Sequence, residues 1–270
     1  MIEDPRGEID YEEVGSGPTV LCVPGSWATR SAWRGVSEAL SCRFRIVTTS
    51  LLGYGRTAER RTTADFSIDR EAEIIEAVLR RAGGRVHLVG HSYGSQACLA
   101  VATRRAVPIA SLCVVEPTSI NLLRRAGELA LYEQMLTFRD SYFQAFERGD
   151  REAARLVVDL HDGDGSFDAL PPRVRDFVMA NTATNVLDWR SHLGWDAPLP
   201  AYSGIAVPCL VIRGERGHAY VATSAEILSG IIPNASLATI SGAAHSVTAT
   251  HSTDVARMIA EHVSKVEANL

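Results

Sequence analysis

The sequence predicts an α/β fold in which a mostly parallel sheet is covered by helices on both faces. Three observations lead to this prediction. Short apolar runs rich in β-branched residues recur along the chain, helical patterns separate them, and one long segment contains helical patterns alone. The 270 residues are enough for one large domain with an insertion.

The strands are expected where the apolar runs lie. An antiparallel hairpin through residues 9–13 opens the chain, and parallel strands follow at residues 19–23, 44–48, 85–89, 110–115, 208–212 and 236–240. Helices are predicted over residues 31–40, 68–83 and 254–266. In the second of these, Ile74, Ile75, Val78 and Leu79 recur at helical spacing and Gly83 follows as a stop signal.

The alternation breaks between Pro117 and Pro208. Residues 122–147, 150–161 and 171–189 all show helical patterns, and the third begins with two prolines, which suit a helix start. The interruption indicates a helical insertion that caps the sheet. We therefore expect a core domain made of residues 1–117 and 205–270, and a cap made of residues 118–204.

Composition excludes several classes of function. The 27 basic and 32 acidic residues form no basic stripe, so a nucleic-acid partner is not expected. The first ten residues are charged, and no run reaches the roughly 18 apolar residues of a spanning helix, so no membrane partner is expected and the cytoplasm is the predicted location. Five scattered cysteines without a C-x-x-C pair suggest neither disulfides nor zinc. We expect a small-molecule substrate, no cofactor and no metal, while the oligomeric state is not indicated.

The stretch GHSYG, residues 90–94, is the strongest functional signal. It has the form G-x-S-x-G, with an apolar strand before it and a helical pattern after it. Such a strand-to-helix turn forces Ser92 into a strained conformation that exposes its hydroxyl at the carboxyl edge of the sheet. Ser92 is therefore the predicted nucleophile.

A serine hydroxyl needs a base, and imidazole is suited to the task because its pKa lies near neutral pH. Of the eight histidines, His245 follows the last predicted strand through a loop of small residues, which places it at the same edge as Ser92. His251 is its rival. For three others, a solvated side chain on a polar helix is the expectation: His161, His192 and His262.

Together these residues resemble the α/β-hydrolase fold superfamily, in its capped branch with a serine nucleophile. GHSYG matches the nucleophile turn, VPGSW stands at the oxyanion loop, LLGYGRT resembles the loop after the family's fourth strand, and GAAHSV matches the histidine loop. The resemblance covers nearly the whole chain and implies an eight-stranded, mostly parallel sheet. It also implies an oxyanion hole made by the backbone N–H groups of Ser26 and Tyr93. Pro24 replaces the family's usual histidine.

The third member of the predicted triad departs from the family pattern. The family usually places an aspartate after the seventh strand, where this sequence has Gly217. Some branches carry the acid after the sixth strand instead, and Glu116 follows the apolar run LCVV there. Glu116 is the predicted acid that orients His245, and Glu215 is the alternative.

The resemblance implies a serine hydrolase that forms an acyl-enzyme on a small, largely apolar carbonyl substrate, whether an ester, a lactone, a thioester or a ketone cleaved at a C–C bond. Trp27, next to the oxyanion loop, and Trp189 are the expected substrate contacts, with Trp195 as a further candidate near the entrance. Two alternatives stay open. One is a cofactor-independent dioxygenase-like enzyme, and the other is a non-catalytic receptor of the same fold that binds a ligand without turnover.

Overall fold

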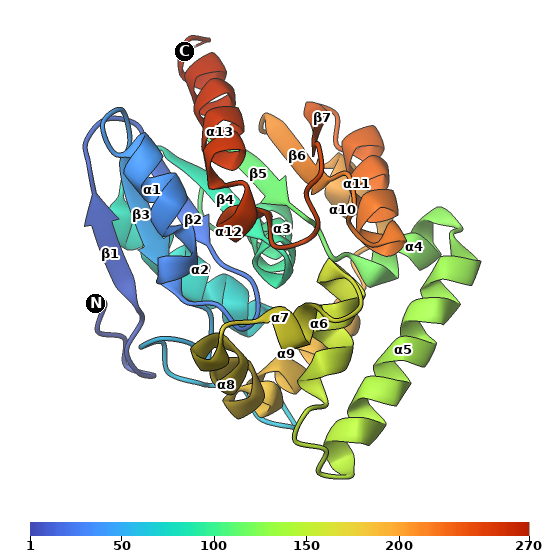
Figure 1. Ribbon diagram of the computed structural model, residues 1–270. Helices are drawn as coiled ribbons and strands as arrows, with labels where there is room; N and C mark the ends of the chain where they lie inside the picture. Colours follow the sequence, from blue (N-terminus) through green and yellow to red (C-terminus); the bar gives the residue numbers. More distant parts are fainter. Residues whose placement is uncertain (270) are drawn as a thin grey trace.

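A computed structural model describes residues 1–269 of the protein (Figure 1). Its centre is a seven-stranded sheet in the order β1-β3-β2-β4-β5-β6-β7. Within residues 1–269, no helix combines the length and the apolar character that crossing a bilayer requires. The strands are β1 (Tyr11–Val14), β2 (Thr19–Val23), β3 (Arg45–Thr49), β4 (Val86–His91), β5 (Ser111–Val115), β6 (Cys209–Gly214) and β7 (Ala235–Ile240).

The strand count of eight was too high by one, and the described residues explain why. Residues 1–10 contribute only an isolated bridge between Ile2 and Ile9, and β1 pairs antiparallel with β3 rather than forming a hairpin with its neighbour in sequence. The connection from β1 to β2 passes close to the start of β3. At Gly15, whose φ is +83°, a Cβ atom would lie 2.3 Å from the carbonyl oxygen of Phe44.

The parallel register gathers the carboxyl ends of the central strands. His91 at the end of β4 lies opposite Val115 at the end of β5, and Gly214 at the end of β6 lies opposite Ile240 at the end of β7. The residues that follow these strands therefore emerge at one edge of the sheet. Ser92, Glu116 and the loop that carries His245 all start there.

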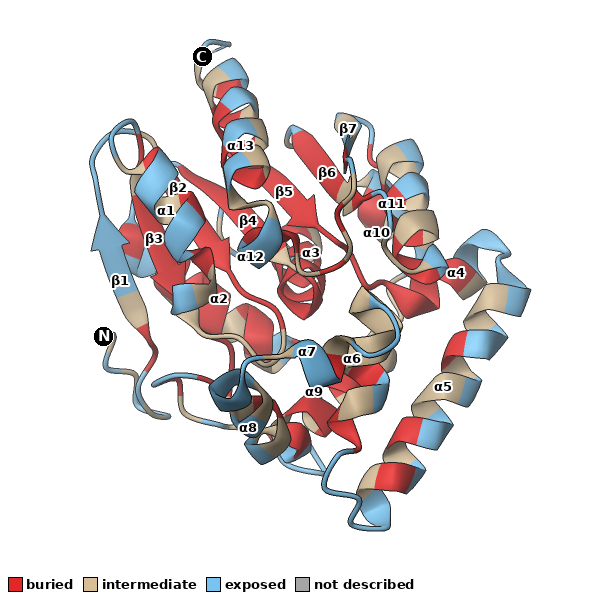
Figure 2. Cartoon of the chain, viewed as in Figure 1, coloured by how far each residue is buried: buried red, intermediate tan, exposed pale blue. Residues whose placement is uncertain are grey.

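Alternating side chains of the strands supply two apolar cores. Val20 and Cys22 face the core formed with α1 (Arg34–Leu40) and α13 (Ser252–Glu267), and Leu21 and Val23 face the other. Figure 2 shows the buried strands between helices whose outer faces are exposed. The second core is formed with α2 (Asp69–Ala82), α3 (Tyr93–Arg104) and α11 (Ala219–Ile231). The sequence patterns did not predict α11.

Between β5 and β6 the chain runs through seven helices, and residues 116–208, all of them described, contain no strand. Figure 1 shows most of these helices gathered at one end of the sheet, whereas the last of them lies beside α11. The predicted helices of this region appear with more breaks than expected, because Gly127 ends the first of them after two turns. They are α4 (Ile120–Ala126), α5 (Leu129–Glu147), α6 (Ala154–Asp162), α7 (Ser166–Ala169), α8 (Pro172–Ala180), α9 (Thr182–Gly194) and α10 (Leu199–Ser203).

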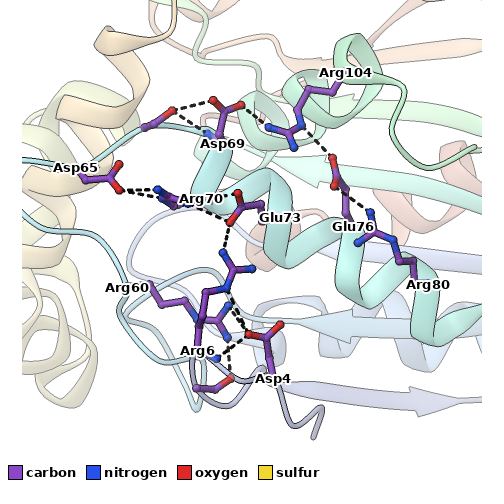
Figure 3. A network of polar contacts seen from close by, with 12 residues as sticks. Asp4, Arg6, Arg60, Asp65, Asp69, Arg70, Glu73, Glu76, Arg80 and Arg104 are labelled. Carbon is purple, nitrogen blue, oxygen red and sulfur yellow. Dashed lines mark hydrogen bonds and ion pairs between the residues drawn. The ribbon is translucent and has the colours of Figure 1, made fainter.

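The long loop between β3 and α2 is held by ion pairs along its length (Figure 3). Near its middle, Arg60 lies 3.2 Å from Asp4 of the N-terminal segment. Closer to α2, Asp65 pairs with Arg70 at 2.7 Å, and Asp69 at the helix start pairs with Arg104 of α3 at 2.6 Å. The Arg60–Asp4 pair is largely shielded from solvent, while the other two are more exposed and contribute little each. Together the pairs restrict the path of the loop.

Candidate active site

Ser92 occupies a strained turn between β4 and α3. Its φ of 54° and ψ of −126° are costly for a residue with a Cβ atom. Both glycines of the motif are required by close contacts. A Cβ atom at Gly90 would lie 2.5 Å from the carbonyl oxygen of Gly94, and one at Gly94 would lie 2.2 Å from the carbonyl oxygen of Pro24. The sequence therefore folds locally into the turn that GHSYG predicts.

A chain of hydrogen bonds joins Ser92 to two residues from other strand ends. The Oγ atom of Ser92 lies 2.8 Å from Nε2 of His245, and Nδ1 of His245 lies 2.9 Å from Oε2 of Glu116. All three side chains are buried, Glu116 completely. With Nδ1–H donating to the carboxylate, Nε2 is the atom that accepts the serine proton. The structure thus brings together the three residues predicted for the triad.

The second oxygen of the Glu116 carboxylate is also held, since it accepts a hydrogen bond from the backbone N–H of Gly214. The neighbouring loop makes room for this side chain. A Cβ atom at Gly217 would lie 3.2 Å from Oε2 of Glu116. The position at which the family's usual aspartate is absent thus lies next to the Glu116 carboxylate.

Glu215 lies elsewhere. One of its carboxylate oxygens accepts hydrogen bonds from the Ser241 hydroxyl and from the Gly242 backbone N–H, both at 2.8 Å, and neither bond involves His245. Glu215 therefore closes the turn after β7. His251 is also apart from the site, because its ring bonds to its neighbour Thr250.

These contacts give a first expected outcome. Glu215→Gln keeps the shape of the side chain and one acceptor, so its effect on kcat should not exceed about twofold, and stability should change little, as for other surface substitutions. Ester hydrolysis and thermal unfolding of the variant provide the measurement. A loss of several hundredfold in kcat would show that Glu215, rather than a turn contact, supports the chemistry.

The loop of residues 24–27 lies against Ser92. A Cβ atom at Gly25 would approach the Cβ of Ser92 to 2.8 Å and its Oγ to 3.3 Å, so only glycine fits. Among the described residues, the backbone N–H groups of Ser26 and Tyr93 donate no hydrogen bond. Tyr93 begins α3, where the first N–H groups have no partner within the helix. Two residues with free backbone donors, Ser26 and Tyr93, therefore line the same cavity as Ser92.

A large cavity of about 830 Å³ opens above Ser92 and His245. Its walls are mostly apolar and come from α6, α8 and α9, together with the loop after β2. Trp27 and Trp189 line it as predicted by position, and Trp27 is fixed by an Nε1–H bond to the carbonyl oxygen of Asn181. Trp195 does not line this cavity and packs edge-on against Tyr202.

The expectation of solvated side chains at His161 and His192 was wrong. The His161 ring stacks on the His245 ring with 4.3 Å between centroids and 18° between planes. Next to it, Asp162 accepts hydrogen bonds from the Ser246 backbone N–H (2.9 Å) and hydroxyl (2.6 Å). The end of α6 thus packs on the loop that carries His245. The sequence patterns missed these contacts because His161 and Asp162 pack against the His245 loop only when the helical insertion is folded.

His192 is buried at the end of α9, where its Nε2 accepts a hydrogen bond from the backbone N–H of Ile120. Burial lowers its pKa to about 4. Burial and the neighbouring His245 likewise lower the pKa of His91 to about 3. Both side chains are therefore neutral at pH 7, and an uncharged ring is what the bond to Ile120 requires.

A pH dependence of stability follows. Unfolded histidine has a pKa near 6.5, so below that pH the unfolded chain binds protons that folded His192 and His91 do not. The free energy of unfolding should be at its full value above pH 6.5 and fall toward pH 4, by up to about 1.4 kcal/mol per pH unit for each histidine. Denaturant titrations at several pH values measure this slope. His192→Asn should make the slope shallower, and an unchanged slope would contradict the assignment.

The chain can now be compared with known proteins. A model of the alpha/beta hydrolase family matches residues 20–258. The chain belongs to this family. The predicted fold class and the prediction of a hydrolase are thereby confirmed.

Relatives and solved structures agree with that membership. The pimeloyl-[acyl-carrier protein] methyl ester esterase of Nitrosomonas europaea is 25% identical over 243 residues, which cover 85% of this chain and 89% of the relative. A thermophilic esterase from Thermogutta terrifontis superposes with a TM-score of 0.75 at 19% identity, covering 96% of this chain and 93% of that one. Est816, described as an N-acyl homoserine lactone degrading enzyme, gives a TM-score of 0.75 at 15% identity, covering 96% and 98%. These structural likenesses show the fold.

Proposed function

We propose that the protein is a serine hydrolase that cleaves a small, largely apolar carbonyl compound through an acyl-enzyme. The observation that carries the proposal is the continuous chain of hydrogen bonds from Ser92 through His245 to Glu116, at the floor of an apolar cavity. A buried acid holds the imidazole in the tautomer that accepts a proton, and the strained turn presents the hydroxyl to the cavity.

The reaction would proceed in two stages. In the first, His245 takes the proton of Ser92 as its oxygen attacks the substrate carbonyl, and the leaving group departs with that proton. In the second, His245 removes a proton from water as the water oxygen attacks the acyl-enzyme. The imidazolium then gives this proton to the departing Ser92 oxygen, and the acid is released. The backbone N–H groups of Ser26 and Tyr93 would stabilise the negative oxygen of both tetrahedral intermediates. The Glu116 side chain stabilises the imidazolium that forms.

The walls of the cavity support the substrate class. Val157, Val174 and Phe177 form part of an apolar lining, and Trp27 and Trp189 are the proposed contacts for the acyl group. We assign all of these walls except Trp27 to a cap of residues 118–204, which sits on a core of residues 1–117 and 205–270. Trp27 belongs to that core. The esterase of Nitrosomonas europaea is named for a methyl ester, and Est816 is described as degrading an N-acyl homoserine lactone. Both are carbonyl compounds of this kind.

The test is a panel of p-nitrophenyl esters, lactones, thioesters and dienone acids, offered to the wild-type protein and to Ser92→Ala. We expect turnover of at least one class by the wild-type protein, with a burst of p-nitrophenol equal to one acyl group per chain, and only a small residual rate, about 10⁶-fold lower, by the variant. Tight binding of panel members without turnover would favour a ligand receptor. A rate that stays near the wild-type value after the alanine substitution would contradict the proposed mechanism.

A further inference from the structure

A buried polar network lies behind the loop of residues 24–27. At its centre, the fully buried guanidinium of Arg61 lies 2.6 Å from Oδ1 of Asp188 and 3.1 Å from Oε1 of Glu71. Arg61 comes from the loop after β3, Glu71 from α2 and Asp188 from α9. Taking such charges out of water costs several kcal/mol for each ion, so a buried pair of this kind is weak evidence for stability. The contacts of this buried network indicate a role other than stabilising the fold.

One side of the network holds Ser26. The hydroxyl of Ser26 donates a hydrogen bond of 2.6 Å to Oδ2 of Asp188, and the Tyr54 hydroxyl donates one of 2.7 Å to the same oxygen. Ser26 lies beside Gly25, which touches Ser92. The position of the Ser26 backbone is therefore set by a carboxylate on α9, 162 residues further along the chain.

The other side of the network holds Tyr93. Its hydroxyl donates a hydrogen bond of 2.8 Å to Ser191 of α9, and Nη1 of Arg61 approaches it to 3.4 Å. Arg61 is itself fixed by two bonds to Glu59 and one to the carbonyl oxygen of Leu52. Ser26 and Tyr93 are thus tied through their side chains to one buried ion pair, while their backbone N–H groups have no partner among the described residues.

We propose that Asp188 and Arg61 are positioning residues that hold the N–H groups of Ser26 and Tyr93 at the spacing an oxyanion requires. The inference rests on the proposed function. Hydrogen-bond donors accelerate acyl transfer to the extent that they are already in place before negative charge develops. The Asp188 carboxylate also shows why α9 matters beyond forming a wall, because the insertion supplies one of the groups that order the oxyanion hole.

The burial of Glu71 and Asp188 indicates that the side chains of this network are held in a fixed arrangement. It raises the pKa of Glu71 to about 7 against the opposing effect of Arg61, and it raises the pKa of Asp188. With two buried acids against one guanidinium, Ser26 and Tyr54 supply the donors that the Asp188 carboxylate still needs. The tether between Asp188 and Ser26 thus stabilises both partners: it satisfies a buried carboxylate and immobilises the loop.

The decisive variant is Ser26→Ala, which removes the hydroxyl tether and leaves the backbone N–H in place. We expect kcat for a p-nitrophenyl ester to fall about 10- to 100-fold with KM within about twofold, since removal of an oxyanion donor itself costs about 10²- to 10³-fold. Affinity for an alkylboronic acid, which forms a tetrahedral adduct on Ser92, should fall by the same factor. Ser26→Thr keeps a hydroxyl and should restore most of the kcat and most of the affinity for the boronic acid.

Ser111→Ala is the matched control, because it also removes a buried hydroxyl bond, of 2.8 Å to His87, but on the opposite edge of the sheet. It should leave kcat and boronate affinity unchanged. Tyr93→Phe removes the second tether and should lower kcat in the same way as Ser26→Ala.

Three outcomes are informative. A lower melting temperature of Ser26→Ala with wild-type kcat and boronate affinity would overturn the positioning role and leave the proposed function intact. So would an equal loss of kcat in the Ser111→Ala control. A wild-type protein that neither hydrolyses esters nor binds the boronate would contradict the proposed function, and this inference with it.

Discussion

Ser92→Ala should lower kcat for a p-nitrophenyl ester by about 10⁶-fold, the loss typical when the nucleophile of a serine triad is removed. Among the described residues, the hydroxyl of Ser92 is the only hydrogen-bond partner of His245 Nε2, so no neighbouring side chain is placed to take over the attack. Residual hydrolysis should match what the free donors of the oxyanion hole and substrate binding provide, about 10³- to 10⁴-fold over water.

Two controls make this result interpretable. Stability should be nearly unchanged or improved, since alanine at position 92 still has the strained φ of 54° but loses a buried hydroxyl. Substrate affinity, measured by calorimetry on the inactive variant, should stay near the wild-type KM. A kcat reduced by less than tenfold would mean that the reaction does not pass through an acyl group on Ser92.

Glu116→Gln should lower kcat by about 10⁴-fold with little change in KM. The amide can mimic the shape of the carboxylate, but it can present an N–H to Nδ1 of His245 and so favour the tautomer in which Nε2 carries the proton and cannot accept one from Ser92. The structure makes this substitution mild in other respects, because one oxygen of the side chain still accepts the bond from Gly214. Rates with Glu116→Asp, which keeps the charge but shortens the reach, should lie between those of Glu116→Gln and the wild type.

The kcat of Glu116→Gln should be compared with that of Glu215→Gln. If both substitutions leave kcat near normal, the acid of the triad is not Glu116 and the hydrogen bond of 2.9 Å to His245 is not used in the reaction. A severe loss of kcat in Glu116→Gln but not in Glu215→Gln would support Glu116, at the end of β5, as the acid of the triad. The family usually has this acid in the loop that here follows β6. A return of activity upon Gly217→Asp in the Glu116→Gln background would indicate that the two positions serve the same carboxylate site.

The sequence predicted those parts of the site that depend on local pattern. Ser92 lies in a motif whose glycines are dictated by contacts within a few residues and the adjoining loop, and Glu116 and His245 follow apolar runs that end at the same edge. The missing aspartate at position 217 was an equally local signal. In each case the residue follows a strand, and the parallel strands end at the same edge of the sheet, so its place in the sequence predicts its place in the structure.

The missed features depend on tertiary contacts. Arg61 and Asp188 are 127 residues apart, and each one alone resembles the charged residues that ordinarily face solvent. His161 stacks on His245 only because α6 folds back over the sheet edge. The overcount of strands has a similar origin, since pairing of β1 with β3 rather than with its neighbour is decided by the path of the chain at Gly15.

The proposed serine-hydrolase mechanism requires above all that Ser92 is a nucleophile activated by His245. The most direct measurement is mass spectrometry of the intact protein and its peptides after treatment with a fluorophosphonate. We predict one adduct per chain, on the peptide that contains Ser92, and at least a hundredfold slower labelling in His245→Ala. An unlabelled protein, or an adduct on another serine with Ser92 unmodified, would contradict the account.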